Sequence, residues 1–142
     1  MNKCCEKLKG FEGLILRLGL AAVFIYHGYG KIFADGAGFG ASWNPHGMPA
    51  WMQVLVSWGE FLAGLGFLTG VMTCGASLGI IFIMAGAIIA VHGKNGFSLM
   101  NKGFEYNYVL IMMCLALIIT GPGKFALPFC GWKCPLEKDK QK

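Results

Sequence analysis

Charged residues are scarce in this sequence. Only 13% of its 142 residues are Asp, Glu, Lys or Arg, whereas a soluble domain carries roughly 25%. Hydrophobic residues make up 56% of the chain, and the mean hydropathy is +0.58. Residues 61–93 contain no charged side chain at all. This composition excludes an ordinary soluble domain and is typical of an integral membrane protein.

Several catalytic motifs are also absent. The sequence has no Gly-rich phosphate-binding loop, no HExxH zinc motif and no nucleophile elbow. Its net charge of +5 comes from lysines in the two termini and two loops, which argues against a nucleic-acid-binding face. The first apolar stretch is too long for a signal peptide and lacks a small-residue cleavage site, so we expect it to remain as a membrane span.

Apolar stretches of about 20 residues are long enough to cross a bilayer. The expected spans are 14–33, 51–71, 75–91 and 106–120. They predict an all-α fold, an integral membrane four-helix bundle, which occupies residues 14–121. A short N-terminal segment, 1–13, precedes the bundle, and a basic tail, 122–142, follows it.

The distribution of Lys and Arg predicts the orientation of the bundle, because positively charged loops resist translocation. With the N-terminus inside, nine of the twelve would be cytoplasmic: Lys3, Lys7, Lys9, Arg17, Lys124, Lys133, Lys138, Lys140 and Lys142. The other three, Lys31, Lys94 and Lys102, would lie outside. We therefore expect a multi-pass protein of the plasma (inner) membrane, surrounded by the lipid bilayer, with both ends in the cytoplasm (N-in/C-in).

Glu60 lies nine residues into the second span, ~14 Å below the outer end of that helix at 1.5 Å per residue. A carboxylate at this depth costs several kcal/mol unless it is protonated, paired or in contact with water. Two interpretations stay open. Glu60 is either a structural partner for a basic residue or a functional group in an internal site.

The first span supplies possible partners for Glu60. Arg17 and Lys31 are fourteen residues apart, which leaves them about 40° apart around the helix, and His27 lies one turn before Lys31. These three side chains therefore form one polar stripe on an apolar helix. By depth, we expect His27 to lie nearest Glu60, with Arg17 reaching toward it from one side and Lys31 from the other.

The ends of the third and fourth spans add further polar groups to the outer half of the bundle. His92 closes the third span, although an interfacial histidine that caps a helix end is the alternative interpretation. A polar cluster inside a membrane bundle is the default candidate for a functional site. The expected catalytic residues are Glu60, His27 and Arg17, and the expected binding residues are Lys31, Glu105, His92 and Asn107.

Closely spaced glycines in the second and third spans, Gly66 with Gly70 and Gly75 with Gly79, allow helix backbones to approach each other. We expect these glycines to face each other within one chain, together with Gly64 and Gly86. A homo-oligomer interface is the alternative.

Four of the six cysteines lie near the termini: Cys4, Cys5, Cys130 and Cys134. In the predicted topology they are cytoplasmic, where thiols stay reduced and a structural disulfide is disfavoured. Scattered reduced thiols are the simplest interpretation. The alternatives are a zinc or iron site built from all four, or a redox pair, although the Cys130–Cys134 spacing is not that of a CxxC motif.

Six short motifs occur in a characteristic order: Arg17-Leu-Gly19, His27-Gly-Tyr-Gly-Lys31, Gly47-Met-Pro49, Glu60-Phe-Leu-Ala-Gly64, Glu105-Tyr-Asn107 and Gly121-Pro-Gly123. Their order and spacing over residues 11–127 resemble the DoxX family. The resemblance implies a four-helix inner-membrane protein in which Arg17, His27, Lys31, Glu60 and Glu105 are the shared polar positions. The segment 124–128 departs from the family pattern because it lacks the usual serine and aspartate, so no role is carried over to those positions.

Relatives of this family include the DoxD-type subunit of thiosulfate:quinone oxidoreductase, MauE-like proteins, and DoxX proteins linked to thiol stress. The resemblance implies a membrane subunit of a redox system that handles sulfur compounds, thiols or quinone. It also implies a soluble redox or sulfurtransferase partner at the cytoplasmic face. A small-solute transporter or channel, and a non-enzymatic membrane anchor, are the alternative functions.

Overall fold

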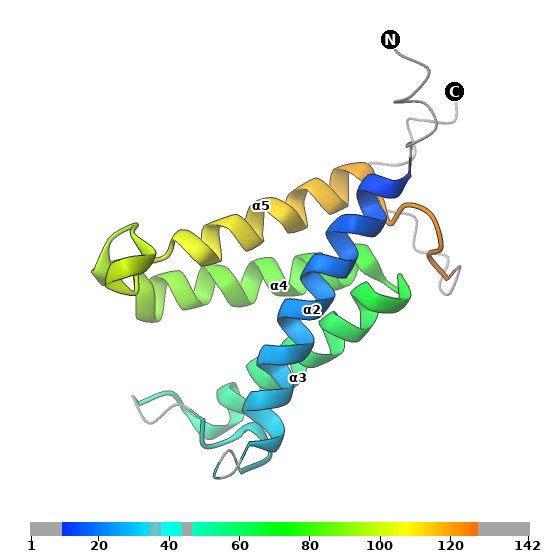
Figure 1. The fold of residues 1–142 in the computed structure, drawn as a ribbon. Coiled ribbons are helices and arrows are strands. Elements are labelled where there is room, and N and C mark those ends of the chain that lie inside the picture. Colours follow the sequence, from blue (N-terminus) through cyan, green and yellow to red (C-terminus); the bar gives the residue numbers. More distant parts are fainter. Residues whose placement is uncertain (1–9, 35, 37, 44–46, 128–142) are drawn as a thin grey trace.

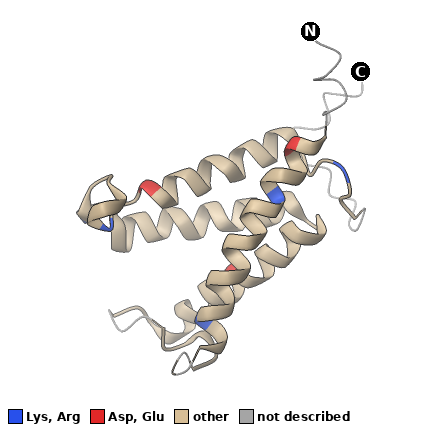
Figure 2. Cartoon of the chain, in the orientation of Figure 1, with Lys and Arg blue, Asp and Glu red and all other residues tan. Residues whose placement is uncertain are grey.

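Four α-helices form the fold of the computed structural model, which describes residues 10–34, 36, 38–43 and 47–127. The helices are α2 (Phe11–Phe33), α3 (Ala50–Thr69), α4 (Thr73–Ala87) and α5 (Glu105–Thr120). The described part contains no strand, which confirms the predicted all-α fold. Three helical stretches, α2, α3 and Thr73–Asn95, are long and apolar enough to cross a membrane, and α5 is a shorter apolar helix. Figure 2 shows how few charged residues interrupt them.

The helices are arranged as two antiparallel hairpins, α2 with α3 and α4 with α5, which spread apart like a V (Figure 1). The beginning of α2, the end of α5 and the turn between α3 and α4 lie at one end, which we call the closed end. The loops 34–49 and 93–104 lie at the tips of the two hairpins, which we call the open end. Apolar side chains fill the core between the helices: Leu20, Phe24, Phe67, Ile80, Cys114 and Leu117.

Backbone contacts hold the closed end together. The Lys124 N–H donates to the Gly10 carbonyl at 2.8 Å, and the Leu127 N–H donates to the Thr69 carbonyl at 3.2 Å. A Cβ atom on Gly13 would lie 2.6 Å from the Gly121 carbonyl oxygen, so only glycine permits this approach. The Gly-Pro-Gly segment after α5 is thus packed directly onto the start of α2.

Glycine also sets the spacing within the α2–α3 hairpin. A Cβ atom on Gly28 would lie 2.6 Å from the backbone nitrogen of Phe61, and one on Gly64 would lie 2.7 Å from the backbone nitrogen of Ile25. By contrast, Gly79 and Gly86 have nothing within 4 Å of such an atom. The expected close approach between the second and third spans is therefore wrong for these two residues. The close approach at Gly64 is real, but it is made to α2.

The end of α4 continues as a π-helical turn, Ile88–His92, followed by a 3₁₀ turn, Gly93–Asn95. A π turn widens a helix by one residue and is frequent at functional sites. Backbone hydrogen bonds fasten the loop after it, because Phe104 N–H donates to Gly96 O and Gly103 N–H donates to Ser98 O. These hydrogen bonds give the loop at the tip of the hairpin a defined conformation.

Candidate functional site: a cavity with an internal ion pair

Lys31 and Glu60 form an ion pair between the last turn of α2 and the middle of α3. The Lys31 Nζ atom lies 2.7 Å from each carboxylate oxygen of Glu60. The Glu60 side chain is only 3% exposed and that of Lys31 is 21% exposed. The expectation that Glu60 pairs with a basic residue is thus met by Lys31. His27 is not that partner, because the long lysine side chain reaches down the helix whereas the imidazole cannot.

Trp43, in the loop between α2 and α3, covers this ion pair. The Lys31 ammonium lies 4.5 Å from the centre of the indole ring, a cation–π contact. The indole N–H donates to the Gln53 carbonyl at 3.2 Å, and the Ser57 hydroxyl donates to the same carbonyl at 2.7 Å. The Trp43–Gln53 hydrogen bond fastens the loop to the first turn of α3 and holds Trp43 over the ammonium.

Sequence reasoning did not find Trp43, Gln53 or Ser57. A signal was present on α3, where Gln53, Ser57 and Glu60 recur at spacings of four and three, which places them on one helix face. All three are buried. A tryptophan in a loop gave no comparable signal.

A cavity of about 840 Å³ lies between the two hairpins in the open half of the bundle. This volume is in the range of pockets that hold a drug-sized ligand, ~300–1,000 Å³. Most of the wall is apolar, and Lys31 and Glu60 form part of it. The lining side chains include Val23, Phe24 and His27 of α2, Met52 and Val56 of α3, Phe82, Ile83 and Met84 of α4, and Tyr106, Asn107 and Leu110 of α5.

Three more of the predicted residues line the cavity, namely His27, His92 and Asn107. The His27 ring lies 6.4 Å from the ring of Tyr106, so these two side chains face each other across the hairpins. The His92 Nδ1 atom lies 2.9 Å from the Lys102 carbonyl oxygen. The Asn107 amide donates to the thioether sulfur of Met84 at 3.3 Å, a weak partner for a buried amide.

Glu105 does not belong to this cluster. Its carboxylate accepts a hydrogen bond from the Leu99 N–H at 2.9 Å, and the residue does not line the cavity. From the start of α5, its carboxylate contacts the loop before that helix, so the structure does not place it beside the other predicted binding residues.

Arg17 also lies away from the cavity, at the closed end. Its side chain is 1% exposed, its Nη2 atom donates to the Lys124 carbonyl at 3.4 Å, and its Nη1 atom packs against Gly70. Fourteen residues along a helix correspond to about 21 Å. Arg17 therefore lies on the same face of α2 as Lys31 but about 21 Å away from it along the helix axis. The expectation that Arg17 acts beside Glu60 is therefore wrong.

The position of Arg17 leads to a prediction. Replacement of Arg17 by methionine keeps the volume but removes the charged hydrogen bond to the segment after α5, a bond typically contributing about 1.5–3 kcal/mol. Amide exchange at Leu127 should accelerate about tenfold in hydrogen–deuterium exchange, while exchange at Phe104, in the loop at the open end, stays within twofold. Unchanged exchange at Leu127 would show that Arg17 does not hold this segment.

The predicted metal ligands Cys4, Cys5, Cys130 and Cys134 lie outside the described residues. Within the described residues, no group of three or more His, Cys, Asp and Glu side chains could hold a metal ion. Cys114 is part of the apolar core.

The apolar helices define a multi-pass membrane protein with an internal cavity. The family model DoxX matches residues 13–93, more than half of the chain. The chain belongs to the DoxX family, which confirms the resemblance seen in its motifs. No curated protein and no solved structure matches the chain. The matched range includes His27, Lys31, Glu60 and His92 but ends before α5.

Proposed function

We propose that this protein is a membrane subunit of a redox system, and that its cavity binds a quinone or a small oxidisable sulfur compound. The observation that carries the proposal is the Lys31–Glu60 ion pair on the wall of a mostly apolar cavity of about 840 Å³. Such a cavity suits a molecule with an apolar body and one polar head. The ion pair supplies both a hydrogen-bond donor and an acceptor for that head.

The chemistry follows from the atoms of the pair. The Lys31 ammonium has three N–H donors, of which two bind the Glu60 oxygens. The third is available to a ligand oxygen or sulfur and stabilises negative charge on it. A bound thiol releases protons and electrons when it is oxidised, whereas a bound quinone takes up two of each when it is reduced. Glu60 accepts a proton from the thiol or passes one to the quinone, with His27 as a second proton-exchanging group on the wall. The redox partner takes the electrons of the thiol or supplies those for the quinone.

The position of the cavity favours a binding site over a channel. Its lining residues begin at Val23 on α2 and end at Leu110 on α5, so it occupies only the open half. Below it, Leu20, Phe67 and Leu117 are almost completely buried in the core. A ligand therefore enters and leaves on the same side.

Binding of decylubiquinone to the purified protein tests the proposal. Glu60→Gln keeps the shape of the side chain but removes its charge, so the Lys31 ammonium, which donates to the quinone oxygen, loses the partner that fixes its position. The affinity should fall by about tenfold, the equivalent of a charged hydrogen bond of about 1.5 kcal/mol. Thiol-dependent quinone reduction in membranes should be lost as well. Glu60→Ala should also destabilise the fold, because it leaves a cavity.

The matched control is Glu12→Gln, since Glu12 is an exposed carboxylate in the first turn of α2, at the closed end. It should bind the quinone as the wild type does. If Glu60→Gln retains full affinity and full activity, the ion pair is structural and the redox proposal is wrong.

We also propose that both ends of the chain are cytoplasmic, from the nine-to-three distribution of Lys and Arg. The open end of the cavity then faces the outside. An impermeant maleimide applied to intact cells should spare Cys4, Cys5, Cys130 and Cys134, and should label them after the membrane is permeabilised. Strong labelling of these four cysteines from outside would show that the orientation is the opposite of the proposed one.

A further inference from the structure

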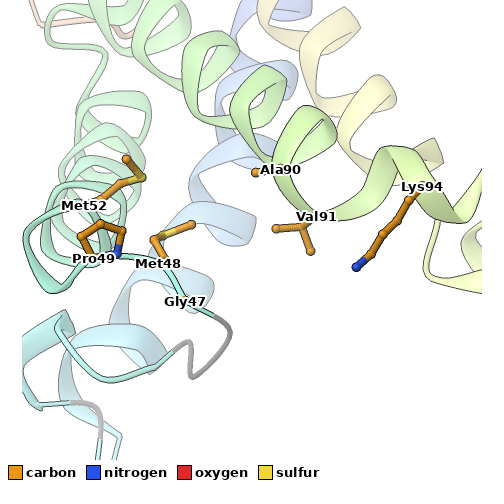
Figure 3. Close-up of a pocket in the computed structure, with 7 residues that line it drawn as sticks. All are labelled: Gly47, Met48, Pro49, Met52, Ala90, Val91 and Lys94. Atoms are coloured by element: carbon orange, nitrogen blue, oxygen red, sulfur yellow. The ribbon is translucent and has the colours of Figure 1, made fainter.

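A second hollow of about 440 Å³ opens beside the main cavity, between the start of α3 and the π-helical end of α4. Figure 3 shows Met48 and Met52 on one side of it, and Val91 and Lys94 on the other. Met48, Met52 and Val91 also line the main cavity. The two hollows therefore share a wall, and the outer one is lined mainly by methionine side chains and small apolar groups.

The charges around this space are unbalanced. Glu60 contributes its negative charge, but that charge is compensated by Lys31. Lys94 lines the outer hollow and Lys102 lines the main cavity, and both are exposed. Among the described residues, the Lys31–Glu60 contact is the sole ion pair. Glu105, whose carboxylate binds the Leu99 N–H in the same loop, offsets one of the two lysine charges, so the mouth keeps a net positive charge. Walls of low dielectric constant focus the field of such charges and raise the local concentration of anions.

The loop structure fixes the place of Lys102. Its carbonyl oxygen accepts a hydrogen bond from the Asn95 amide at 3.1 Å, and its N–H donates to the Leu99 carbonyl at 2.9 Å. The His92 ring adds a contact of 2.9 Å to the same carbonyl oxygen. The backbone of Lys102 is therefore held at the cavity mouth by three contacts.

We infer that the ligand of this cavity is an amphipathic anion with an acidic head and a single apolar chain. The head is bound by Lys102 and Lys31, after attraction by Lys94, and the chain lies between Met52 and Val91. A volume of about 840 Å³ suits a drug-sized molecule and is too small for a whole two-chain phospholipid. The inference rests on the proposed function, and it selects an anionic sulfur compound or another acid over an uncharged quinone.

The test compares 2-bromododecane-1-sulfonate with 2-bromododecan-1-ol, whose bromine lies beside the head group and hence near Trp43, at equal mole fractions in phosphatidylcholine nanodiscs that contain the full-length protein. Bromine quenches a nearby indole, so Trp43 reports binding, as the difference in quenching between the wild type and Trp43→Phe. The sulfonate should bind at least tenfold more tightly than the alcohol, and salt should weaken only the sulfonate. Lys94→Gln/Lys102→Gln should abolish most of this preference and leave the affinity for the alcohol unchanged.

The control is Lys124→Gln, an exposed lysine at the closed end, which should keep the preference. Equal affinities for sulfonate and alcohol, or a preference that survives the double substitution, would show that the ligand is not selected by charge. If decylubiquinone binding still depends on Glu60 in that case, the proposed function stands and this inference falls. If neither quinone nor sulfonate responds to changes at Lys31 or Glu60, both fall. If phosphatidylglycerol displaces the sulfonate with the same dependence on Lys94 and Lys102, the ligand is a phospholipid, and the inference of a single-chain ligand is wrong.

Discussion

Replacement of Lys31 by methionine should lower the free energy of unfolding by about 3–5 kcal/mol, the usual cost of removing one partner from a buried ion pair. The Glu60 carboxylate is 3% exposed and lies 2.7 Å from the Lys31 ammonium with both oxygens. Without the ammonium, the carboxylate must keep its charge at very low exposure or take up a proton, and either costs free energy. Reversible unfolding in mixed detergent micelles, followed by far-UV circular dichroism, measures the loss.

A second substitution separates the charge from the packing. Lys31→Met/Glu60→Gln removes both charges at nearly constant volume, so it should regain most of the lost stability. Lys102→Met is the matched control, because Lys102 is exposed and forms no ion pair in the described structure, and its effect should stay within about 0.5 kcal/mol. A double variant as unstable as Lys31→Met would mean that the lysine stabilises the bundle by its packing alone.

Alanine at Gly28 or Gly64 should be the other highly damaging change. The new methyl group would lie 2.6 Å from the Phe61 nitrogen in the first case and 2.7 Å from the Ile25 nitrogen in the second. Because backbone atoms cannot rotate away, α2 and α3 must separate, at a cost at or above the roughly 1–3 kcal/mol of ordinary overpacking. Since the same spacing brings Lys31 to Glu60, ligand affinity should fall with stability.

Gly79→Ala and Gly86→Ala provide the control for this prediction. Both positions have open space around the added atom, and alanine favours a helix over glycine by up to about 1 kcal/mol. These variants should be neutral or more stable than the wild type in the same unfolding assay. If all four substitutions have the same effect, helix propensity and not the α2–α3 contact determines it.

Much of the fold could be predicted from the apolar runs alone. The expected end of the first span, Phe33, is the end of α2, and α3 begins one residue before the expected Trp51. The start of α2 at Phe11 was missed because the charged Glu12 falls in its first turn, where a carboxylate is favourable near the helix N-terminus. The pairing of Glu60 with a basic residue was one of the two interpretations that its depth left open.

The arrangement of the hairpins could not be predicted in this way. Helical periodicity gives the face on which a residue lies, but not the angle between two hairpins, so neither the cavity nor the separation of Arg17 from Glu60 was visible. Trp43 reaches the ion pair through a loop whose course depends on hydrogen bonds to α3. The role of Glu105 depends on a backbone N–H six residues earlier in the chain, which no helical pattern reveals.

The hairpins are tied together unevenly. Hydrogen bonds such as those from Lys124 to Gly10 and from Leu127 to Thr69 join them at the closed end, whereas the Lys31–Glu60 ion pair lies wholly within one hairpin. Between α3 and α4 the chain turns through Gly70 and Met72, both in the left-handed region. A change in the separation of the tips would therefore leave the ion pair intact. Such a change would let the proposed site accept ligands of different thickness, and discrimination would then depend on the polarity and charge of the head more than on the width of the body.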